Sequence, residues 1–424
     1  MTEDFLHYLW RHQHFTTHSL QLRDGRQLQI KHPGYTNPNA GPDFSNARLK
    51  IEDQEWAGQV EIHIQSGDWY KHQHQDDPAY QSVILHVVYE HTQAVYYQGN
   101  QEIPTLELKG IIDDYLYWRY EQMVQTSLSI PCAGNVKEID GLLKLSMQER
   151  ALIERLEKKK NTILTLVEHN QGDWYLTYYQ WFSRAFGLKV NAEPMLMLAR
   201  QLSPQIVLRL NSLLQTEALF LGMAGFLETA RDDYSNTLKQ EFTHLKNKYN
   251  LHPLASHIWK YARLRPPAFP EFRIALLAAF WFKNQQPLDF KLLFKTLDSG
   301  PSLFAAEASN YWKTHYRLGK TSARPHAAKL GQTTVNTLLI NVAAPFRFAY
   351  GKAIGDAQAA DGTFELLHQI VPEQNKITQL YQKLGFENKD AVHSQGLIAL
   401  HEYYCKPKAC LKCSLGIKIL KSTL

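Results

Sequence analysis

The hydrophobic pattern changes its period near residue 140, and this change divides the chain into two kinds of structure. Before it, apolar and polar residues alternate, as in Ala47–Ile51 and Val60–Ile64, which is typical of β-strands with one buried face. After it, apolar residues recur every three or four positions, first in Leu152–Val167, which predicts amphipathic helices. We therefore expect an α+β fold, with an N-terminal mixed sheet and flanking helices followed by a mainly α-helical bundle region.

The length of 424 residues exceeds the size at which one hydrophobic core keeps growing, so several domains are expected. We predict an α/β domain with a candidate metal site in residues 1–135, helical domains in residues 136–400, and a basic, cysteine-rich segment in residues 401–424. Acids at the start of the chain, where a secretory signal has bases, and the lack of a long apolar run predict a cytoplasmic protein without membrane contact. The sequence sets no oligomeric state.

The formal net charge of +5 permits contact with polyanions such as DNA or RNA but does not require it. Basic residues near the Pro266-Pro267 turn and after it are candidates for a phosphate-binding surface, although arginines of this kind are usually salt-bridge partners. No phosphate-binding loop or dinucleotide fingerprint occurs in a suitable context. The basic residues in question are Arg263, Arg265, Arg273, Arg317, Lys320, Arg324 and Arg347.

Two hairpins are predicted in the first hundred residues. In the first, alternating leucines flank the Asp24-Gly25 pair, which suits a tight turn. The second joins Ala47–Ile51 to Val60–Ile64. A later apolar run, Val83–Tyr89, predicts a strand that is buried on both faces.

The second hairpin brings chemically active side chains together. Glu61 and His63 share one face of their strand, because strand side chains alternate between faces. A turn about Asp53-Gln54 would place Asp43 opposite Ile64 and beside His63. Two carboxylates and an imidazole are therefore expected to converge.

The spacing of Pro42-Asp43 and Glu61-Ile62-His63 resembles the restriction-endonuclease-like PD-(D/E)XK superfamily, whose signature is Pro-Asp, a spacer, an acid, any residue and lysine. The resemblance implies a metal-dependent nuclease that hydrolyses phosphodiester bonds of DNA or RNA, with Asp43 and Glu61 holding Mg²⁺ or Mn²⁺. His63 stands where the superfamily has lysine, and imidazole is a better ligand for zinc or manganese than for magnesium. We expect His63 to orient or deprotonate the attacking water and His86 to be a further metal ligand.

Each of these residues also has a plainer interpretation. Asp43 can form an Asx-turn, Glu61 and His63 can lie on a solvated strand face, and His86 can be a hydrogen-bonded core residue. His72 and His74 are interpreted as surface residues. The competing functions are a non-catalytic nucleic-acid-binding or scaffold protein with a degenerate nuclease core, and another metal-dependent hydrolase with zinc held by His63, His74 and His86.

Three of the four cysteines lie close together near the C-terminus as Cys405, Cys410 and Cys413. The C-x4-C-x2-C spacing predicts three thiolates on one metal, with Cys132 as the fourth ligand and His401 in reserve. Spacing does not choose between structural zinc and an iron–sulfur cluster. The alternative is four thiols without metal.

Four segments taken together resemble a bacterial family known as domain of unknown function 2851. The likeness spans nearly the full chain and implies no particular reaction. The segments are Gly41–Phe44, Gly58–His63, Ile84–Val88 and Tyr404–Cys413.

Overall fold

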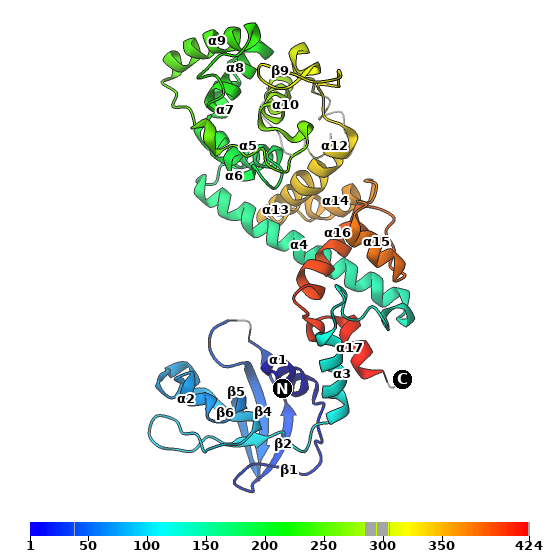
Figure 1. The fold of residues 1–424 in the computed structure, drawn as a ribbon. Coiled ribbons are helices and arrows are strands. Elements are labelled where there is room, and N and C mark those ends of the chain that lie inside the picture. Colours follow the sequence, from blue (N-terminus) through cyan, green and yellow to red (C-terminus); the bar gives the residue numbers. More distant parts are fainter. Residues whose placement is uncertain (38, 285–293, 295–303, 305, 423–424) are drawn as a thin grey trace. The chain divides into compact units, whose positions relative to one another are not determined.

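The computed structural model describes residues 1–37, 39–284, 294, 304 and 306–422. The chain forms two compact units, one of Met1–Met147 with His401–Leu424 and one of Gln148–Leu400 (Figure 1). The cysteine-rich segment, which the sequence sets apart as a third region, thus belongs to the N-terminal unit. The long helix α4 (Gly141–His169) contains the boundary at Met147.

A seven-stranded mixed sheet forms the centre of the first unit (Figure 1). The strand order is β1-β2-β4-β5-β6-β7, and β3 pairs with β4. Strands β2, β4 and β5 are antiparallel neighbours, whereas β5, β6 and β7 run parallel. The strands are β1 (Leu20–Gln21), β2 (Gln27–His32), β3 (Tyr35–Thr36), β4 (Phe44–Ile51), β5 (Gln54–Gln65), β6 (Val83–Glu90) and β7 (Thr105–Glu107).

The first predicted hairpin is confirmed, since Leu20 pairs with Leu28 around the Asp24-Gly25 turn and Gly25 has a φ of +88°. In the second hairpin, Ile51 pairs with Gln54, so the chain turns one residue earlier than predicted. A bulge between Phe44 and Ala47 shifts the register further, and Phe44 pairs with Val60. The predicted register, with Asp43 opposite Ile64, is therefore wrong.

The sheet is covered on both faces. Helix α1 (Glu3–His12), capped by the Thr2 hydroxyl, buries Phe5, Leu9 and Trp10 in a core that includes Val60, Ile62, Leu85 and Val87 of β5 and β6. Helix α2 (Asp68–Lys71) and the following turns cover the opposite face, where Trp69, Tyr80 and Val83 form a smaller apolar cluster. All six residues of Val83–Val88 are buried, which confirms the strand predicted to be buried on both faces.

The second unit is helical apart from the short β8–β9 hairpin, as far as its described residues show (Figure 1). The helix predicted over Leu152–Val167 is confirmed as part of α4, and α9 begins at a capping box formed by Asp232 and Ser235. Among the described helices, none combines the length and apolarity needed to cross a bilayer. The elements are α5 (Trp174–Phe186), α6 (Ala192–Gln201), α7 (Pro204–Val207), α8 (Leu213–Met223), α9 (Asp233–Tyr249), α10 (Pro270–Lys283), β8 (His315–Arg317), β9 (Lys320–Thr321), α12 (Gln332–Leu338), α13 (Ala344–Ile354), α14 (Ala357–His368), α15 (Lys376–Lys383) and α16 (Ala391–Leu400).

Gly58 tests the close approach of β5 and β6. A Cβ atom at this position would lie 2.5 Å from Ile84 Cγ2 and 2.7 Å from the Ser82 carbonyl oxygen. We expect Gly58→Val to lower the free energy of unfolding by about 2 kcal/mol, the usual scale of overpacking, in urea unfolding followed by circular dichroism. Gly134→Ala is the matched control, because nothing lies within 4 Å of its Cβ position. Equal stability of the two variants would contradict the tight packing.

Candidate metal centre

The bulge brings Asp43 and Glu61 into reciprocal contact across strands β4 and β5. The Ile62 amide donates to Asp43 Oδ2 over 3.0 Å, and the Asp43 amide donates to Glu61 Oε2 over 3.1 Å. Each carboxylate thus accepts a backbone hydrogen bond from the partner strand. These contacts hold both acids at one end of the hairpin and leave Glu61 Oε1 directed toward the histidines.

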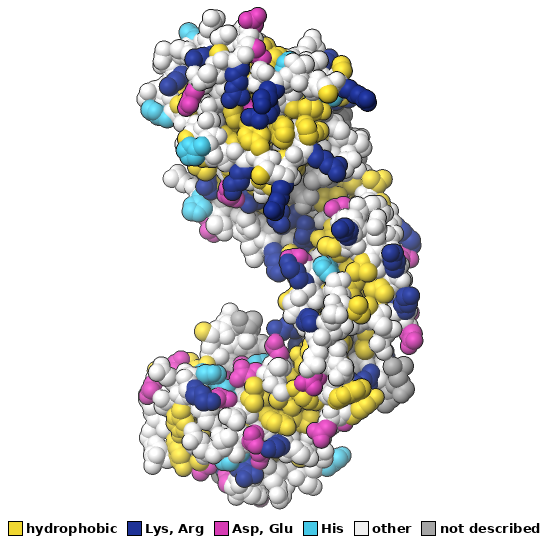
Figure 2. Space-filling view, in the orientation of Figure 1, with side chains coloured by type: hydrophobic (Ala, Val, Ile, Leu, Met, Phe, Trp, Pro, Cys, Tyr) yellow, Lys and Arg dark blue, Asp and Glu magenta, His cyan; other side chains and the backbone are white. Residues whose placement is uncertain are grey.

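Three imidazoles gather beside that free oxygen. His63 Nε2 lies 3.1 Å from His72 Nδ1 and 3.5 Å from Glu61 Oε1, and His74 Nε2 lies 3.3 Å from Glu61 Oε1. One ring nitrogen from each of His63, His72 and His74 lies within 4.8 Å of the other two. Figure 2 shows histidine and acidic side chains next to one another on this unit. The structure therefore adds His72 and His74 to the acid and histidine of β5.

The segment after β5 places the two added histidines. Gln73, between them, has a left-handed φ of 61°, which reverses the chain after α2. Asp77 then caps the short helical turn Pro78–Ser82, as its Asp-Pro sequence predicts, by accepting from the Ala79 amide. Tyr80 of this turn stacks on His74 with ring centroids 3.8 Å apart. His74 is therefore packed inside the unit, whereas His72 is exposed. The prediction that both are surface residues is confirmed for His72 alone.

His86 lies behind the cluster. It pairs with Glu61 across the parallel strands β5 and β6, and its Nε2 is 2.8 Å from His63 Nδ1. When His63 Nδ1 carries the proton and donates it to His86, His63 Nε2 keeps a free lone pair toward His72 and Glu61. The geometry thus gives His86 the position of an orienting partner and not that of a fourth ligand beside Asp43 and Glu61.

Burial controls the charge of these groups. Desolvation, with the positive charges of His74 and His72, lowers the pKa of His63 to about 3, and burial lowers the pKa of His86 far below its usual value. Both rings are therefore neutral near pH 7, the form that ligates metals. Burial also raises the pKa of Glu61, an effect that Asp43 strengthens and a hydrogen bond with His74 opposes. A buried carboxyl group beside neutral imidazoles favours a cation.

A residue that the sequence did not single out, His7 of α1, lies at the rim of the site, with Nε2 3.2 Å from Asp43 Oδ2. Burial lowers the pKa of His7, but the contacts with Asp43 outweigh that effect and raise it. Its only sequence signal is the concentration of histidines in the first 91 residues.

The donor set fits a transition metal better than magnesium. Ligands about 2.0–2.1 Å from tetrahedral zinc are about 3.3 Å from one another. The three separations that join His63, His72, His74 and Glu61 are 3.1, 3.3 and 3.5 Å, which is close to that edge length. Three imidazoles and one carboxylate suit zinc or manganese, whereas magnesium prefers oxygen ligands alone. His63, His72 and His74 are the described residues whose donor atoms all lie within 4.8 Å of one another, and Glu61 Oε1 lies within 3.5 Å of His63 and His74, so these side chains could hold an ion.

The four cysteines also come together within the first unit. Burial raises the pKa of Cys132, and the thiolate charges of Cys405, Cys413 and Cys410 raise it further. The same causes raise the pKa of Cys410 to about 12. The C-terminal three are buried and Cys132 is half-buried, and the three lie close enough to Cys132 to raise its pKa.

Contacts from the C-terminal segment explain why Cys132 meets the other three. Lys408 Nζ donates to the carbonyl oxygens of Val124 and Thr126 at the end of α3 (Asp114–Gln125). Arg119, also on α3, donates to backbone oxygens of α17 (Ser414–Lys421) and of Ser422. The chain end is thereby held beside the residues that lead to Cys132.

Comparison with known proteins bears on the whole chain. No curated protein and no solved structure matches it. The sequence profile of the family described as "Protein of unknown function (DUF2851)" matches residues 3–376, which include Asp43, Glu61, the three clustered histidines and Cys132. Because that match covers most of the 424 residues, the chain belongs to this family.

Proposed function

We propose that the protein is a metal-dependent hydrolase whose centre is formed by Glu61, His63, His72 and His74, with Asp43 and His7 at its rim. The observation that carries the proposal is the convergence of three imidazole nitrogens within 4.8 Å, with a buried carboxylate oxygen within 3.5 Å of two of them. Buried polar groups without a partner are costly, and a divalent cation would satisfy several of them at once.

A phosphodiester in DNA or RNA is the substrate that we propose. Its support is the order of elements, with helix α1, antiparallel strands β2, β4 and β5, helix α2 and parallel strand β6. Asp43 precedes the second of these three antiparallel strands and Glu61 lies on the third, which is the placement that the PD-(D/E)XK resemblance implies. His63 replaces the lysine of that signature and moves the metal preference toward zinc or manganese.

The side chains of the proposed centre have different roles. A bound metal would act as a Lewis acid and lower the pKa of water. Glu61 and the three histidines hold the ion, and His86 fixes the ring of His63 through Nδ1. Asp43 braces β4 against β5 through the Ile62 amide and holds His7 at the entrance. With its pKa lowered to about 3, His63 is a ligand and too weak a base to deprotonate the nucleophile.

Metal binding is tested first with His72→Ala. Because His72 is exposed, its removal leaves the apolar core intact. We expect this variant to bind zinc at least about tenfold more weakly than the wild type, at or beyond the loss seen when supporting groups of a metal site are removed. Competition with a chromogenic chelator measures the affinity. His18→Ala is the matched control, since His18 is exposed and lies outside the cluster. Equal zinc affinity of all three proteins would reject the centre.

Catalysis is tested with Glu61→Gln. The glutamine retains an oxygen that can accept from the Asp43 amide, so the strand contact survives while the charge is lost. We expect the cleavage of labelled single- and double-stranded DNA and RNA, with zinc or manganese, to fall at least about 100-fold, as when a transition-state electrostatic contact is lost. Gel electrophoresis with time measures the rate.

The result also separates the competing functions. If the wild type retards the same nucleic acids on a native gel but leaves them intact with every metal, the nuclease proposal is wrong and the binding or scaffold function stands. If it neither retards nor cleaves them but hydrolyses another ester in a way that depends on Glu61, the hydrolase stands and the nucleic-acid substrate falls.

We also infer a structural metal site at Cys132, Cys405, Cys410 and Cys413. Each of Cys132 and Cys410 has a pKa that the other cysteines help to raise, and four cysteines are the donor set of tetrahedral zinc or of an iron–sulfur cluster. The site would fasten residues 401–424 to the region after α3, in addition to the Lys408 and Arg119 contacts.

Cys132→Ser tests this second site. We expect the variant to lose the metal of the cysteine site, measured by elemental analysis, and to lose any visible absorption band that marks an iron–sulfur cluster. Ser414→Ala, next to Cys413, is the control that keeps the metal. His72→Ala should keep it too, since that residue belongs to the other centre. Full metal content in Cys132→Ser would show that the thiols carry none.

A further inference from the structure

A cavity of about 630 Å³ lies inside the helical unit, remote in sequence from the centre proposed above. Helices α4, α5, α10, α12 and α16 contribute to its walls. Its basic residues are Arg155, Lys159, Arg184, Lys189 and Arg273, and the acidic residue among its lining is Glu373. Figure 2 shows lysine and arginine side chains gathered on this part of the surface. The size is that of a site for a small organic ligand.

Most of this positive charge has no carboxylate partner among the described residues. Arg184 forms an ion pair with Glu193, 2.8 Å away. Glu373 accepts hydrogen bonds from the side-chain amides of Asn375 and Gln395, so its oxygens already have neutral donors. Lys159 donates to Asn341 Oδ1 over 2.8 Å, a neutral acceptor in the π-helical turn Leu339–Ala343. Such turns occur often at functional sites.

Arg273 is the most deeply placed of these cations, with 4% of its surface exposed. Its Nε donates to the Phe186 carbonyl oxygen over 2.9 Å, while its Nη2 is buried without a hydrogen-bond partner. Burial lowers the pKa of this guanidinium to about 10. Trp181, 7% exposed, also has a buried indole N–H without a partner. The guanidinium also lies over the Phe186 ring, 4.9 Å from its centroid, but no described carboxylate neutralises it. A buried cation without an anionic partner is costly, which favours a bound anion beside it.

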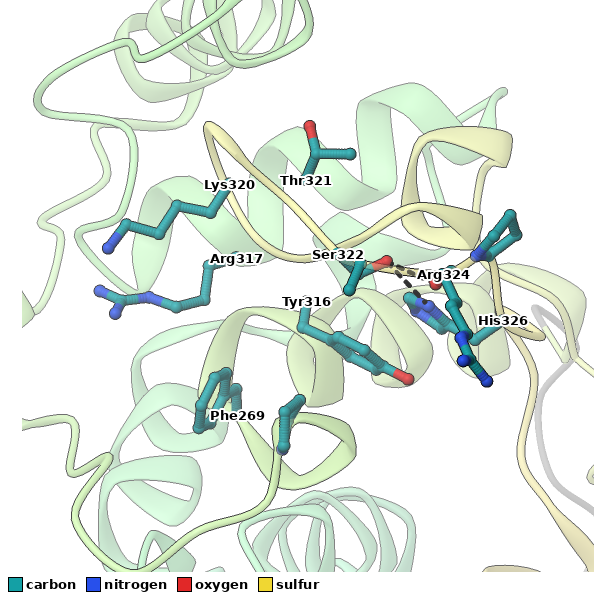
Figure 3. Close-up of a pocket in the computed structure, with 11 residues that line it drawn as sticks. Phe269, Tyr316, Arg317, Lys320, Thr321, Ser322, Arg324 and His326 are labelled. Atoms are coloured by element: carbon teal, nitrogen blue, oxygen red, sulfur yellow. Dashed lines mark hydrogen bonds between the residues drawn. The ribbon is translucent and has the colours of Figure 1, made fainter.

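A second cavity of about 630 Å³ in the same unit provides a contrast (Figure 3). It is lined by Arg317, Lys320 and Arg324, which the sequence grouped with Arg273 as a candidate phosphate-binding surface. In Figure 3, Arg317 and Lys320 extend to one side and Arg324 to the other, so these charges do not converge. Arg317 lies 3.5 Å from Glu271 and is already neutralised. Of the predicted basic residues, Arg273 therefore lines one cavity, and Arg317, Lys320 and Arg324 line the other.

We propose that the cavity of Arg155, Lys159 and Arg273 binds a phosphorylated small molecule of nucleotide size. Arginine matches the geometry of phosphate oxygens. Burial and the nearby Arg155 lower the pKa of Lys159 far below its usual value, and a phosphate beside its Nζ would favour the charged form. Trp181, Leu188, Leu338 and Ile398 line the same space and give an organic part of the ligand an apolar wall. The unpaired N–H groups of Arg273 and Trp181 are donors for its oxygen atoms. This site lies in the other unit and does not rest on the proposed hydrolase.

Calorimetric titration of the full-length protein tests the proposal with four probes: ATP, AMP, inorganic pyrophosphate and adenosine. We expect saturable binding of one or more phosphate-bearing probes and none of adenosine. Arg155→Gln and Lys159→Gln should each weaken that binding at least tenfold. In the second of these, glutamine can still donate to Asn341, which protects the fold. Lys320→Gln and Arg324→Gln, from the cavity in Figure 3, are the matched controls and should bind as the wild type does.

A 5′-phosphorylated oligonucleotide distinguishes the source of the phosphate. If it binds at this cavity while ATP, AMP and pyrophosphate do not, the small-molecule ligand is wrong. The absence of saturable binding by all phosphate-bearing probes overturns the proposal, as do affinities that stay the same in Arg155→Gln and Lys159→Gln. A loss of affinity that appears equally in the Lys320→Gln and Arg324→Gln controls would also overturn it, because the charge effect would then be unspecific.

Discussion

The parallel pairing of β5 with β6 is the constraint on which the candidate centre depends. It places Glu61 opposite His86 and lets His86 reach His63 Nδ1. Because α1 covers one face of this pair and the α2 region the other, the polar side chains are removed from water together. Desolvation keeps both histidines neutral and raises the pKa of Glu61. The burial of β5 and β6 therefore produces a polar site whose carboxyl group favours the binding of a cation.

Among the described residues, each unit buries an ionisable side chain without an oppositely charged partner beside it, an acid in the sheet unit and a guanidinium in the helical unit. In the sheet unit, the buried side chain of Glu61 lies beside the imidazoles of His63 and His74 and forms no ion pair with a described lysine or arginine. In the helical unit, the buried guanidinium of Arg273 contacts the carbonyl oxygen and the aromatic ring of Phe186 and forms no ion pair with a described carboxylate. Burial of an ionisable group without a charge partner lowers stability, so a fold that maintains such groups indicates ligands that offset the cost. By contrast, buried Glu217 accepts from Ser309, Tyr234 and Trp312 and has a fully structural explanation.

Local features of the fold could be predicted from the sequence, whereas long-range features could not. The Asp24-Gly25 hairpin, the Asp77 cap and the doubly buried strand β6 were predicted, because each depends on neighbouring residues. The register of β4 on β5 was not, since the turn closed one residue early and a bulge followed at Phe44–Ala47. That error moved Asp43 from Ile64 to Glu61 and Ile62. His72 was missed as a partner, and His74 was named only in the zinc-hydrolase alternative, because a polar loop carries no periodic signal for where its side chains point.

The sequence by itself determined the α+β division, the strands that carry Glu61, His63 and His86, and the set of cysteines, because periodicity and spacing act over a few residues. Tertiary structure decided which imidazoles lie beside Glu61, that His86 contacts His63 Nδ1 from behind the cluster, and that Arg273 lines a different cavity from Arg317 and Arg324. These outcomes depend on chain reversal, burial and the packing of elements distant in sequence. Such contacts are set by the shape of the whole core, and no local pattern of residues encodes them.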